Sequence, residues 1–268
     1  MKEFLSENIA KTSWKMSLFR AYGWQHLLII SVGLFLCIFF AYKFRKINEK
    51  QNDRLLFGVG VFLLVSELYK QLFYYFYIGG GIYPWWIFPF QLCSVPMYIL
   101  MMLPFIRNAS IKRGMYNFMA TYNLLGGFLS LFEPSGLTHE YVTLTTHAFI
   151  WHLMLVFVGF YLIASNRCIN DIKGYRYATY TFLTLCVIAF IINLILRDVS
   201  NETVNMFFVG PSNNPIMVYK DIAKSYGWKI ATLIYIPTVC LGAFIVFYII
   251  KLIKKRFFIN GSIDTITY

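Results

Sequence analysis

The sequence predicts an all-α, polytopic membrane protein built as a bundle of seven transmembrane helices. The 268-residue chain is 59% hydrophobic and 13% charged, whereas a typical soluble domain is about 25% charged. Its apolar residues gather in stretches close to the length that crosses a bilayer. Its Lys and Arg residues fall in short clusters between these stretches, which is typical of membrane proteins with several spans.

The seven expected spans follow one another along the chain. They cover approximately residues 27–42, 55–78, 85–105, 117–132, 146–164, 177–196 and 230–250. A helix rises about 1.5 Å per residue, so roughly 20 residues cross a hydrocarbon core about 30 Å thick. The first and fourth spans are short. Gly126 and Gly127 leave open whether the fourth is a full span or is broken, tilted or tightly packed.

The charge of the loops predicts the orientation of the bundle. The chain carries a net charge of +12, and four basic clusters alternate with two connections that contain no Lys or Arg, residues 79–84 and 133–141, and with the long segment 197–229, which mixes both signs. The clusters consist of Lys43, Arg45, Lys46, Lys50, Arg54, Arg107, Lys112, Arg113, Arg167, Lys173, Arg176, Lys251, Lys254, Lys255 and Arg256. The positive-inside rule then places the N-terminus outside and the C-terminus inside a cell membrane.

The same distribution identifies the partners to expect. The basic inner loops suit anionic headgroups, and membrane lipids are the environment and the candidate substrate. Nucleic acid is not expected, because its binders gather Lys and Arg on one face of a soluble domain. The five cysteines show no paired spacing, so neither a disulfide framework nor a metal site is predicted, and no cofactor is implied.

Three regions make up the predicted organisation. Residues 1–25 form an N-terminal interfacial segment, an amphipathic helix that lies at the membrane surface despite Lys2, Lys11, Lys15 and Arg20. Residues 26–256 form the seven-helix membrane domain. Residues 257–268 form a short C-terminal tail.

Two ionisable residues interrupt the second span. Glu67 and Lys70 are three residues apart and therefore share a helix face, which Gln71 and Tyr74 extend. Charged side chains inside hydrocarbon cost several kcal/mol by most estimates. Two interpretations stay open, an internal ion pair that fixes helix packing and a polar stripe that lines a wet cavity.

The third span contains three prolines, Pro84, Pro89 and Pro96. Each removes a backbone donor and restricts the residue before it, so a regular first half of this helix is not expected. Irregular backbone at membrane depth is tolerated where it is buried in protein or lines a cavity. Gln91, Cys93 and Ser94 are therefore candidates for a polar lining.

The fifth span contributes two histidines, His147 and His152. They point about 140° apart on a helix and lack the i, i+4 spacing of a metal pair. Either side chain is a hydrogen-bonding partner for a neighbouring helix or a catalytic base. His152 is the first catalytic candidate and His147 the second.

Counting along the spans places Cys93, His152 and Glu67 at similar depth in the outer half of the bilayer. A thiol, an imidazole and a carboxylate are the components of an activated cysteine nucleophile. Residues 201–216 are too apolar for a solvated loop and too rich in Gly, Pro and Asn for a span. They suggest a structured lid or re-entrant loop that adds Asn205 and Asn214 to the lining, and Asn123 of the fourth span joins it.

Three sequence blocks resemble the YwaF-like family of integral membrane proteins, which includes the eukaryotic transmembrane protein 164. The blocks are Phe88-Pro89-Phe90-Gln91-Leu92-Cys93-Ser94, the helix from His147 to Tyr161, and Asn205-Met206-Phe207-Phe208 with Pro211, Asn214 and Pro215. The resemblance implies seven helices and, for the eukaryotic branch, cysteine-dependent acyl transfer between phospholipids with Cys93 as the acyl-accepting nucleophile. Bacterial members tend to have His where this chain has Gln91. Because an amide takes no proton at neutral pH, a base has to come from elsewhere, His152 first.

The function that follows is a cysteine-dependent lipid acyltransferase or acyl hydrolase that acts in the outer half of the bilayer. Gln91, Ser94 or Asn123 would then stabilise the oxyanion. An alternative is a transporter or channel that uses Glu67 and Lys70 as an intramembrane polar pair. A further alternative is a non-catalytic accessory membrane protein in which Cys93 and the histidines only pack.

Overall fold

The computed structural model describes residues 2–18, 20–212 and 214–258. Within these ranges all regular elements are helical, and the one pairing of extended backbone is an isolated antiparallel bridge between Lys15 and Tyr141. The all-α prediction is thereby confirmed. The last helix, α10, continues to Phe258, and residues 259–268 of the predicted tail lie outside the described part.

Among the residues that the structure describes, five helices are long and apolar enough to cross a membrane. They are α2 (Trp24–Phe44), α3 (Glu49–Phe73, extended to Ile78 by the π-helix η1, Tyr74–Ile78), α7 (Val142–Ala164), α8 (Ile172–Leu196) and α10 (Trp228–Phe258). They correspond to the first, second, fifth, sixth and seventh predicted spans. The third and fourth predicted spans take other forms, so the count of seven stays a prediction.

The third predicted span is irregular in its first half, as its prolines indicate. A single 3-10 turn, η2 (Trp85–Ile87), is followed by non-helical backbone, and the α-helix α4 begins only at Val95 and ends at Met102. A second 3-10 turn, η3 (Leu103–Phe105), follows. Because an imino nitrogen is tolerated in the first helical turn, Pro96 sits at the start of α4 without breaking it.

The fourth predicted span is one continuous helical segment with a π-helical turn in its middle. It consists of α5 (Ala109–Phe118), η4 (Met119–Asn123) and α6 (Leu124–Phe132). Gly127 does not break it. A Cβ there would lie 3.1 Å from Val156 Cγ2 and 3.3 Å from the His152 carbonyl oxygen, so this glycine allows α6 to pack closely on α7.

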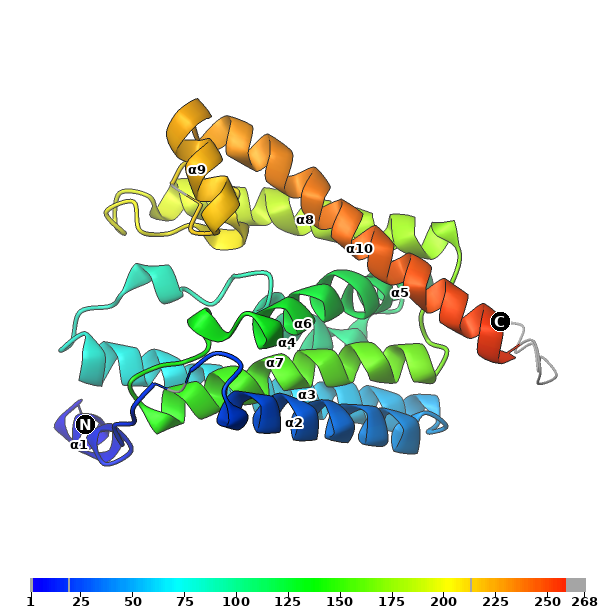
Figure 1. The fold of residues 1–268 in the computed structure, drawn as a ribbon, viewed down its shortest axis with the longest axis horizontal. Helices are drawn as coiled ribbons and strands as arrows, with labels where there is room; N and C mark the ends of the chain where they lie inside the picture. The colour runs from blue at the N-terminus through cyan, green and yellow to red at the C-terminus, as the bar shows by residue number, and fades with distance from the viewer. Residues whose placement is uncertain (1, 19, 213, 259–268) are drawn as a thin grey trace.

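The helices form two groups that meet at the centre. Figure 1 shows α2, α3 and α7 side by side along one side of the molecule, α8 and α10 along the other, and α4, α5 and α6 between them. Stacked rings join the groups: Tyr122 of η4 lies 5.8 Å from Phe118 and 4.6 Å from Phe182 of α8, measured between ring centroids. All three side chains are fully buried.

Ion pairs and hydrogen bonds connect the segments that carry the basic clusters. These segments lie together at one end of the bundle, which we call the basic end. Lys112 Nζ lies 3.1 Å from Asp53 Oδ1, and Arg167 Nη2 lies 3.0 Å from Glu49 Oε1. Lys254 Nζ donates to Asn166 Oδ1 at 2.7 Å. The predicted sorting of loops onto a common side is therefore confirmed, whereas the direction of the bundle across a membrane stays a prediction.

The opposite end, which we call the pocket end, carries most of the short elements. These are α1 (Lys2–Ala10), η1, η2, η5 (Pro134–Gly136), η6 (Met206–Phe208) and α9 (Met217–Tyr226). The N-terminal segment is attached here: Met16 N donates to Glu140 O and Val142 N donates to Trp14 O, each at 2.9 Å. Ile9 is buried against the bundle. The interfacial position predicted for residues 1–25 stays a prediction.

Candidate functional site

A charged pair is buried in α3. Glu67 is 3% exposed, and its Oε1 lies 2.8 Å from Lys70 Nζ, whose side chain is 21% exposed. Gln71 Nε2 donates to the same oxygen at 2.6 Å. The ion pair anticipated from the i, i+3 spacing is therefore formed, and its oxygen has two partners.

The polar stripe of α3 also holds the segment that precedes α4. Gln71 Nε2 donates to Ile87 O at 2.9 Å, and the Tyr83 hydroxyl donates to Gln71 Oε1 at 2.6 Å. A backbone without regular helix needs such partners, because its own polar groups are otherwise unpaired. The charged pair and the irregular segment thus form one connected polar cluster.

Gln91 binds the loop that follows α8. Its Nε2 donates to Asn205 O at 3.0 Å, and its Oε1 accepts from Phe207 N at 3.0 Å. Both atoms of the amide are therefore used by protein backbone. In this arrangement Gln91 joins two distant segments of the chain.

Asn193 of α8 holds the same loop from the other side, and sequence reasoning missed it. The buried amide accepts from Met206 N at 2.6 Å and donates to Met206 O at 3.0 Å. A single Asn within the apolar span 177–196 was the available signal. The loop itself is strained, since Phe207 and Phe208 have φ values of 54° and 55°, a region that bulky residues rarely adopt.

The residues of the predicted lid fold against the bundle. The Phe207 ring lies 5.9 Å from Phe90 and 6.2 Å from Phe182. Asn205 turns the loop, because its Oδ1 accepts from Gly210 N and its Nδ2 donates to Ser212 O. Asn214 Oδ1 accepts from Ile216 N at 2.9 Å, while its Nδ2 is buried without a partner.

Cys93 lies directly against α7. Its carbonyl oxygen accepts from Trp151 Nε1 at 3.0 Å, so the residue before His152 is in contact with the segment that carries the thiol. Cys93 is half-buried and its neighbour Ser94 is buried.

The two histidines of α7 have different partners. His152 is buried, and its Nδ1 lies 2.7 Å from the Ala148 carbonyl oxygen. A carbonyl only accepts, so Nδ1 carries the proton and Nε2 is the basic nitrogen. The His147 ring packs on Trp151 at 5.4 Å between centroids, and its buried Nε2 has no hydrogen-bond partner.

Asn123 lies in the π-helical turn η4, opposite α7. Its Nδ2 donates to Leu155 O at 3.3 Å and its buried Oδ1 has no partner. The structure therefore places the backbone of Cys93 against the side chain of Trp151, the residue before His152 on α7. Glu67, in contrast, is paired with Lys70 and Gln71. Asn205 and Asn214 form hydrogen bonds within the loop that follows α8.

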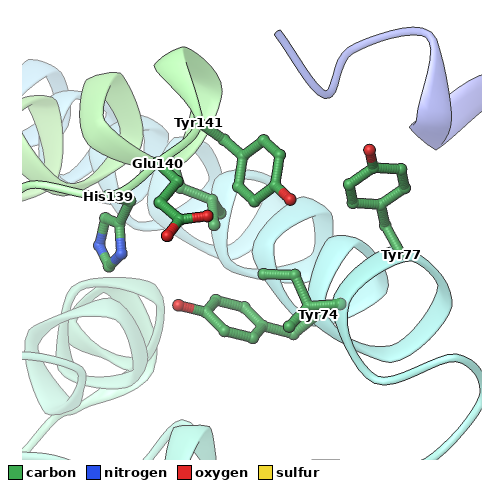
Figure 2. A pocket seen from close by; sticks show the side chains of 7 residues that line it. Tyr74, Tyr77, His139, Glu140 and Tyr141 are labelled. Atoms are coloured by element: carbon green, nitrogen blue, oxygen red, sulfur yellow. The ribbon is translucent and has the colours of Figure 1, made fainter. Parts of the chain in front are cut away.

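A pocket of about 380 Å³ opens at the pocket end (Figure 2). Its lining consists of Tyr74, Tyr77, Ile78, His139, Glu140, Tyr141 and Leu144. The pKa of the His139 imidazole is lowered from its ordinary value, mainly by burial and further by the Lys70 charge. Sequence reasoning missed this pocket, because it arises only where η1 meets the start of α7.

Within the described residues, no group of three or more His, Cys, Asp or Glu side chains is placed to hold a metal ion.

The long apolar helices and the polar cluster buried among them define a multi-pass helical membrane protein. The chain belongs to the TMEM164 family, whose family model matches residues 21–254. This confirms the relationship to transmembrane protein 164, under the TMEM164 name and not the YwaF name. Curated proteins and solved structures give no match to the chain.

Proposed function

We propose that the protein is a cysteine-dependent lipid acyltransferase that works in the half of the bundle nearer the pocket end. The hydrogen bond from Trp151 Nε1 to the Cys93 carbonyl carries this proposal. This bond supports the proposal because it joins the backbone of Cys93 to the residue that precedes His152. A thiol and an imidazole on adjoining segments are the components of an activated nucleophile.

His152 serves as the base in this proposal. The Ala148 carbonyl holds the proton on Nδ1 at 2.7 Å, so Nε2 is the nitrogen that takes the proton from the Cys93 thiol. Because the ring is anchored to its own helix, its orientation is set before a substrate arrives. His147 is the second candidate base, and its unpartnered Nε2 is available to bind a water or a lipid oxygen.

The reaction has two balanced steps. The Cys93 sulfur attacks the ester carbonyl of a phospholipid, a thioester forms, and the ester C–O bond breaks. The lipid hydroxyl that leaves takes the proton from His152. A second lipid hydroxyl, or water in a hydrolase, gives its proton to His152 and attacks the thioester carbonyl. The C–S bond breaks, and the leaving Cys93 thiolate takes the proton back from His152, which restores the thiol.

The remaining polar residues take supporting roles. Ser94 follows the nucleophile directly and is the proposed donor to the oxyanion. Asn123 is the proposed lining residue opposite α7, through its unpartnered Oδ1. Glu67, Lys70 and Gln91 hold the irregular segment in place, and Asn205 and Asn214 do the same for the loop after α8.

The proposal also includes the position in the membrane. Seven segments cross a cell membrane, with the N-terminus outside, the C-terminus inside and the catalytic half of the bundle in the outer leaflet. The basic end then faces the anionic headgroups of the inner leaflet. Cysteine-accessibility labelling from each side of intact cells tests this, with single cysteines placed at Glu133 and at Lys173.

The decisive experiment uses the full chain in nanodiscs that contain a phospholipid with a labelled acyl chain. We expect transfer or release of the label and a thioester on Cys93 detectable by intact mass. Cys93→Ala should abolish both, whereas the matched variant Cys186→Ala on α8 should retain them. His152→Gln should slow thioester formation by about 10²-fold or more. An unchanged rate in Cys93→Ala contradicts the proposal.

The charged pair inside α3 favours a second candidate function, a transporter or channel. A buried Glu67 bound to Lys70 at 2.8 Å is a group whose pairing an ion or a proton could change. Flux into liposomes would then depend on a gradient and be lost in Glu67→Gln. Gradient-independent acyl transfer decides against this candidate.

A further inference from the structure

The pocket at the pocket end is a second candidate site, separate from the proposed acyl-transfer centre. Its walls come from η1 on one side and from the residues around the start of α7 on the other (Figure 2). Neither Cys93 nor His152 belongs to its lining. A volume of about 380 Å³ suits a small organic group.

Aromatic rings form much of the pocket. Tyr74, Tyr77 and Tyr141 all belong to its lining, and the Tyr77 and Tyr141 rings are 5.4 Å apart in an edge-on arrangement. Figure 2 shows the hydroxyl end of Tyr74 and the Tyr141 ring on either side of the Glu140 carboxylate. Aromatic faces attract organic cations through the quadrupole of the ring.

The charge of the lining agrees with the aromatic walls. Glu140 is the acidic residue of the lining, and no Lys or Arg side chain belongs to it. Lys70, whose charge acts on His139, is itself paired with Glu67 at 2.8 Å. The lining therefore includes one carboxylate and no Lys or Arg, in a chain whose net charge is +12.

We propose that this pocket binds an organic ammonium group, with the cation between the tyrosine rings and its charge balanced by Glu140. The ammonium group comes from a free amine or from the headgroup of a lipid. The binding is independent of Cys93, so the proposal does not rest on the acyl-transfer function.

The N-terminal segment holds this pocket together. Ile9 packs in one apolar cluster with Tyr74 and Leu144, against which Tyr77 and Tyr141 also pack. Lys15 forms the backbone bridge to Tyr141, and Met16 N donates to Glu140 O. The TMEM164 match begins at residue 21, so these supports lie outside the matched part of the chain.

The test is a titration of the full chain in phosphatidylglycerol nanodiscs, followed by calorimetry. The ligands are choline, tetramethylammonium and 3,3-dimethylbutan-1-ol, which has the shape of choline without the charge. We expect both cations to bind at least about tenfold more tightly than the neutral alcohol. Equal affinity for choline and the alcohol overturns the proposal.

Matched variants locate the binding. Glu140→Gln should weaken choline binding by about tenfold, whereas Glu133→Gln, an acid in the same loop outside the lining, should leave it unchanged. Both side chains are exposed, so neither variant is expected to disturb folding. Tyr141→Leu should weaken binding further, with thermal unfolding as its control. Equal effects of Glu140→Gln and Glu133→Gln overturn the assignment.

Nanodisc composition separates the two sources of the ammonium group. If a lipid headgroup occupies the pocket, discs of phosphatidylcholine should compete with free choline and lower its apparent affinity in a Glu140-dependent manner. If a free amine is the ligand, choline affinity should be the same in both kinds of disc. Either result supports an ammonium site, and the absence of choline binding in phosphatidylglycerol discs contradicts it.

Discussion

At the basic end, buried Asn52 donates to the Tyr116 hydroxyl at 3.0 Å and accepts from the Tyr161 hydroxyl at 2.8 Å. At the pocket end, in contrast, His147 Nε2 and Asn214 Nδ2 are buried without partners. The basic end also has two such atoms, in Ser165 and Arg167, but there a second Arg167 nitrogen is bound to Glu49 and to Ile47 O.

The two ends also differ in how many residues have a strained backbone conformation. Among the described non-glycine residues with positive φ, Asn166 lies at the basic end. The others lie at the pocket end: Tyr22, Asn201, Glu202, Phe207 and Phe208. Residues held in such conformations cost on the order of 1–3 kcal/mol each and persist where the surrounding structure fixes them. The pocket end therefore carries most of the strained backbone.

This difference assigns separate tasks to the two ends. At the basic end, a buried amide with satisfied partners and two ion pairs set the register of α3, α5 and α7. Strained loops concentrate at the pocket end, where both proposed sites lie. Variants at each end test whether the two ends are energetically distinct.

The largest effect is expected from Lys70→Met. This change leaves the Glu67 charge, which is 3% exposed, with Gln71 as its hydrogen-bond partner. Leaving a buried charge without its counter-charge costs about 3–5 kcal/mol. Thermal unfolding in nanodiscs should show this loss, and the double variant Lys70→Met with Glu67→Gln should recover most of it.

The matched control is Lys224→Met on α9, whose side chain is exposed and should cost less than about 1 kcal/mol. Glu67→Gln alone should cost less than Lys70→Met, because Lys70 is 21% exposed and reaches water more easily. If Lys70→Met and Lys224→Met lose the same amount of thermal stability, the charged pair does not stabilise the fold.

The next effect concerns the basic end. Asn52→Leu removes the partner of both the Tyr116 and the Tyr161 hydroxyls, and two buried groups without partners cost about 2–4 kcal/mol together. We expect the whole bundle to lose thermal stability. Asp53→Asn, which weakens the more exposed pair with Lys112, serves as control and should change stability by about 1 kcal/mol or less.

A smaller and more local effect is expected at the pocket end. Asn193→Ala leaves Met206 N without its hydrogen-bond partner and Met206 O with Val209 N as its remaining donor, which costs about 1–3 kcal/mol. Because the loop is already strained, the change should open residues 204–209 before the rest of the bundle unfolds. Hydrogen exchange should therefore rise in this loop and stay unchanged at Asn52. Equal changes at both sites contradict the distinction between the ends.

Sequence predicted the long elements of the fold because apolar length alone determines them. The spans at α2, α3, α7, α8 and α10 and the gathering of basic loops at one end follow from hydropathy and charge. The break before α4 follows from Pro84 and Pro89. The count of seven could not be settled, because the segment from Ala109 to Phe132 mixes buried polar residues such as Asn117 and Asn123 with its apolar ones.

The candidate site was less predictable because its partners are set by tertiary contacts. Counting residues along the helices predicted that Cys93 and His152 lie at a similar depth. The hydrogen bond from Trp151 to the Cys93 carbonyl, in contrast, depends on which face α7 turns toward the third segment, and counting does not give this. Gln91 illustrates the same point. A glutamine near a proline reads as a polar lining, whereas its partners, Asn205 and Phe207, lie more than a hundred residues later.

The smallest expected effect is a dependence on pH through His139. The pKa of this imidazole lies below its ordinary value of 6.5, first because of burial and second because of Lys70. The unfolded chain therefore binds a proton more readily than the folded one, and stability should fall as the pH drops below 6.5 toward the lowered pKa. Above that window His139 contributes no pH dependence.

The measurement is the thermal midpoint of unfolding of the wild type and of His139→Gln across this pH window. The difference between the two midpoints should grow as the pH falls. Choline affinity should fall only near and below the lowered pKa, where the folded His139 takes up its proton and adds a positive charge beside Glu140. Identical pH profiles for wild type and His139→Gln would separate the histidine from both stability and the pocket.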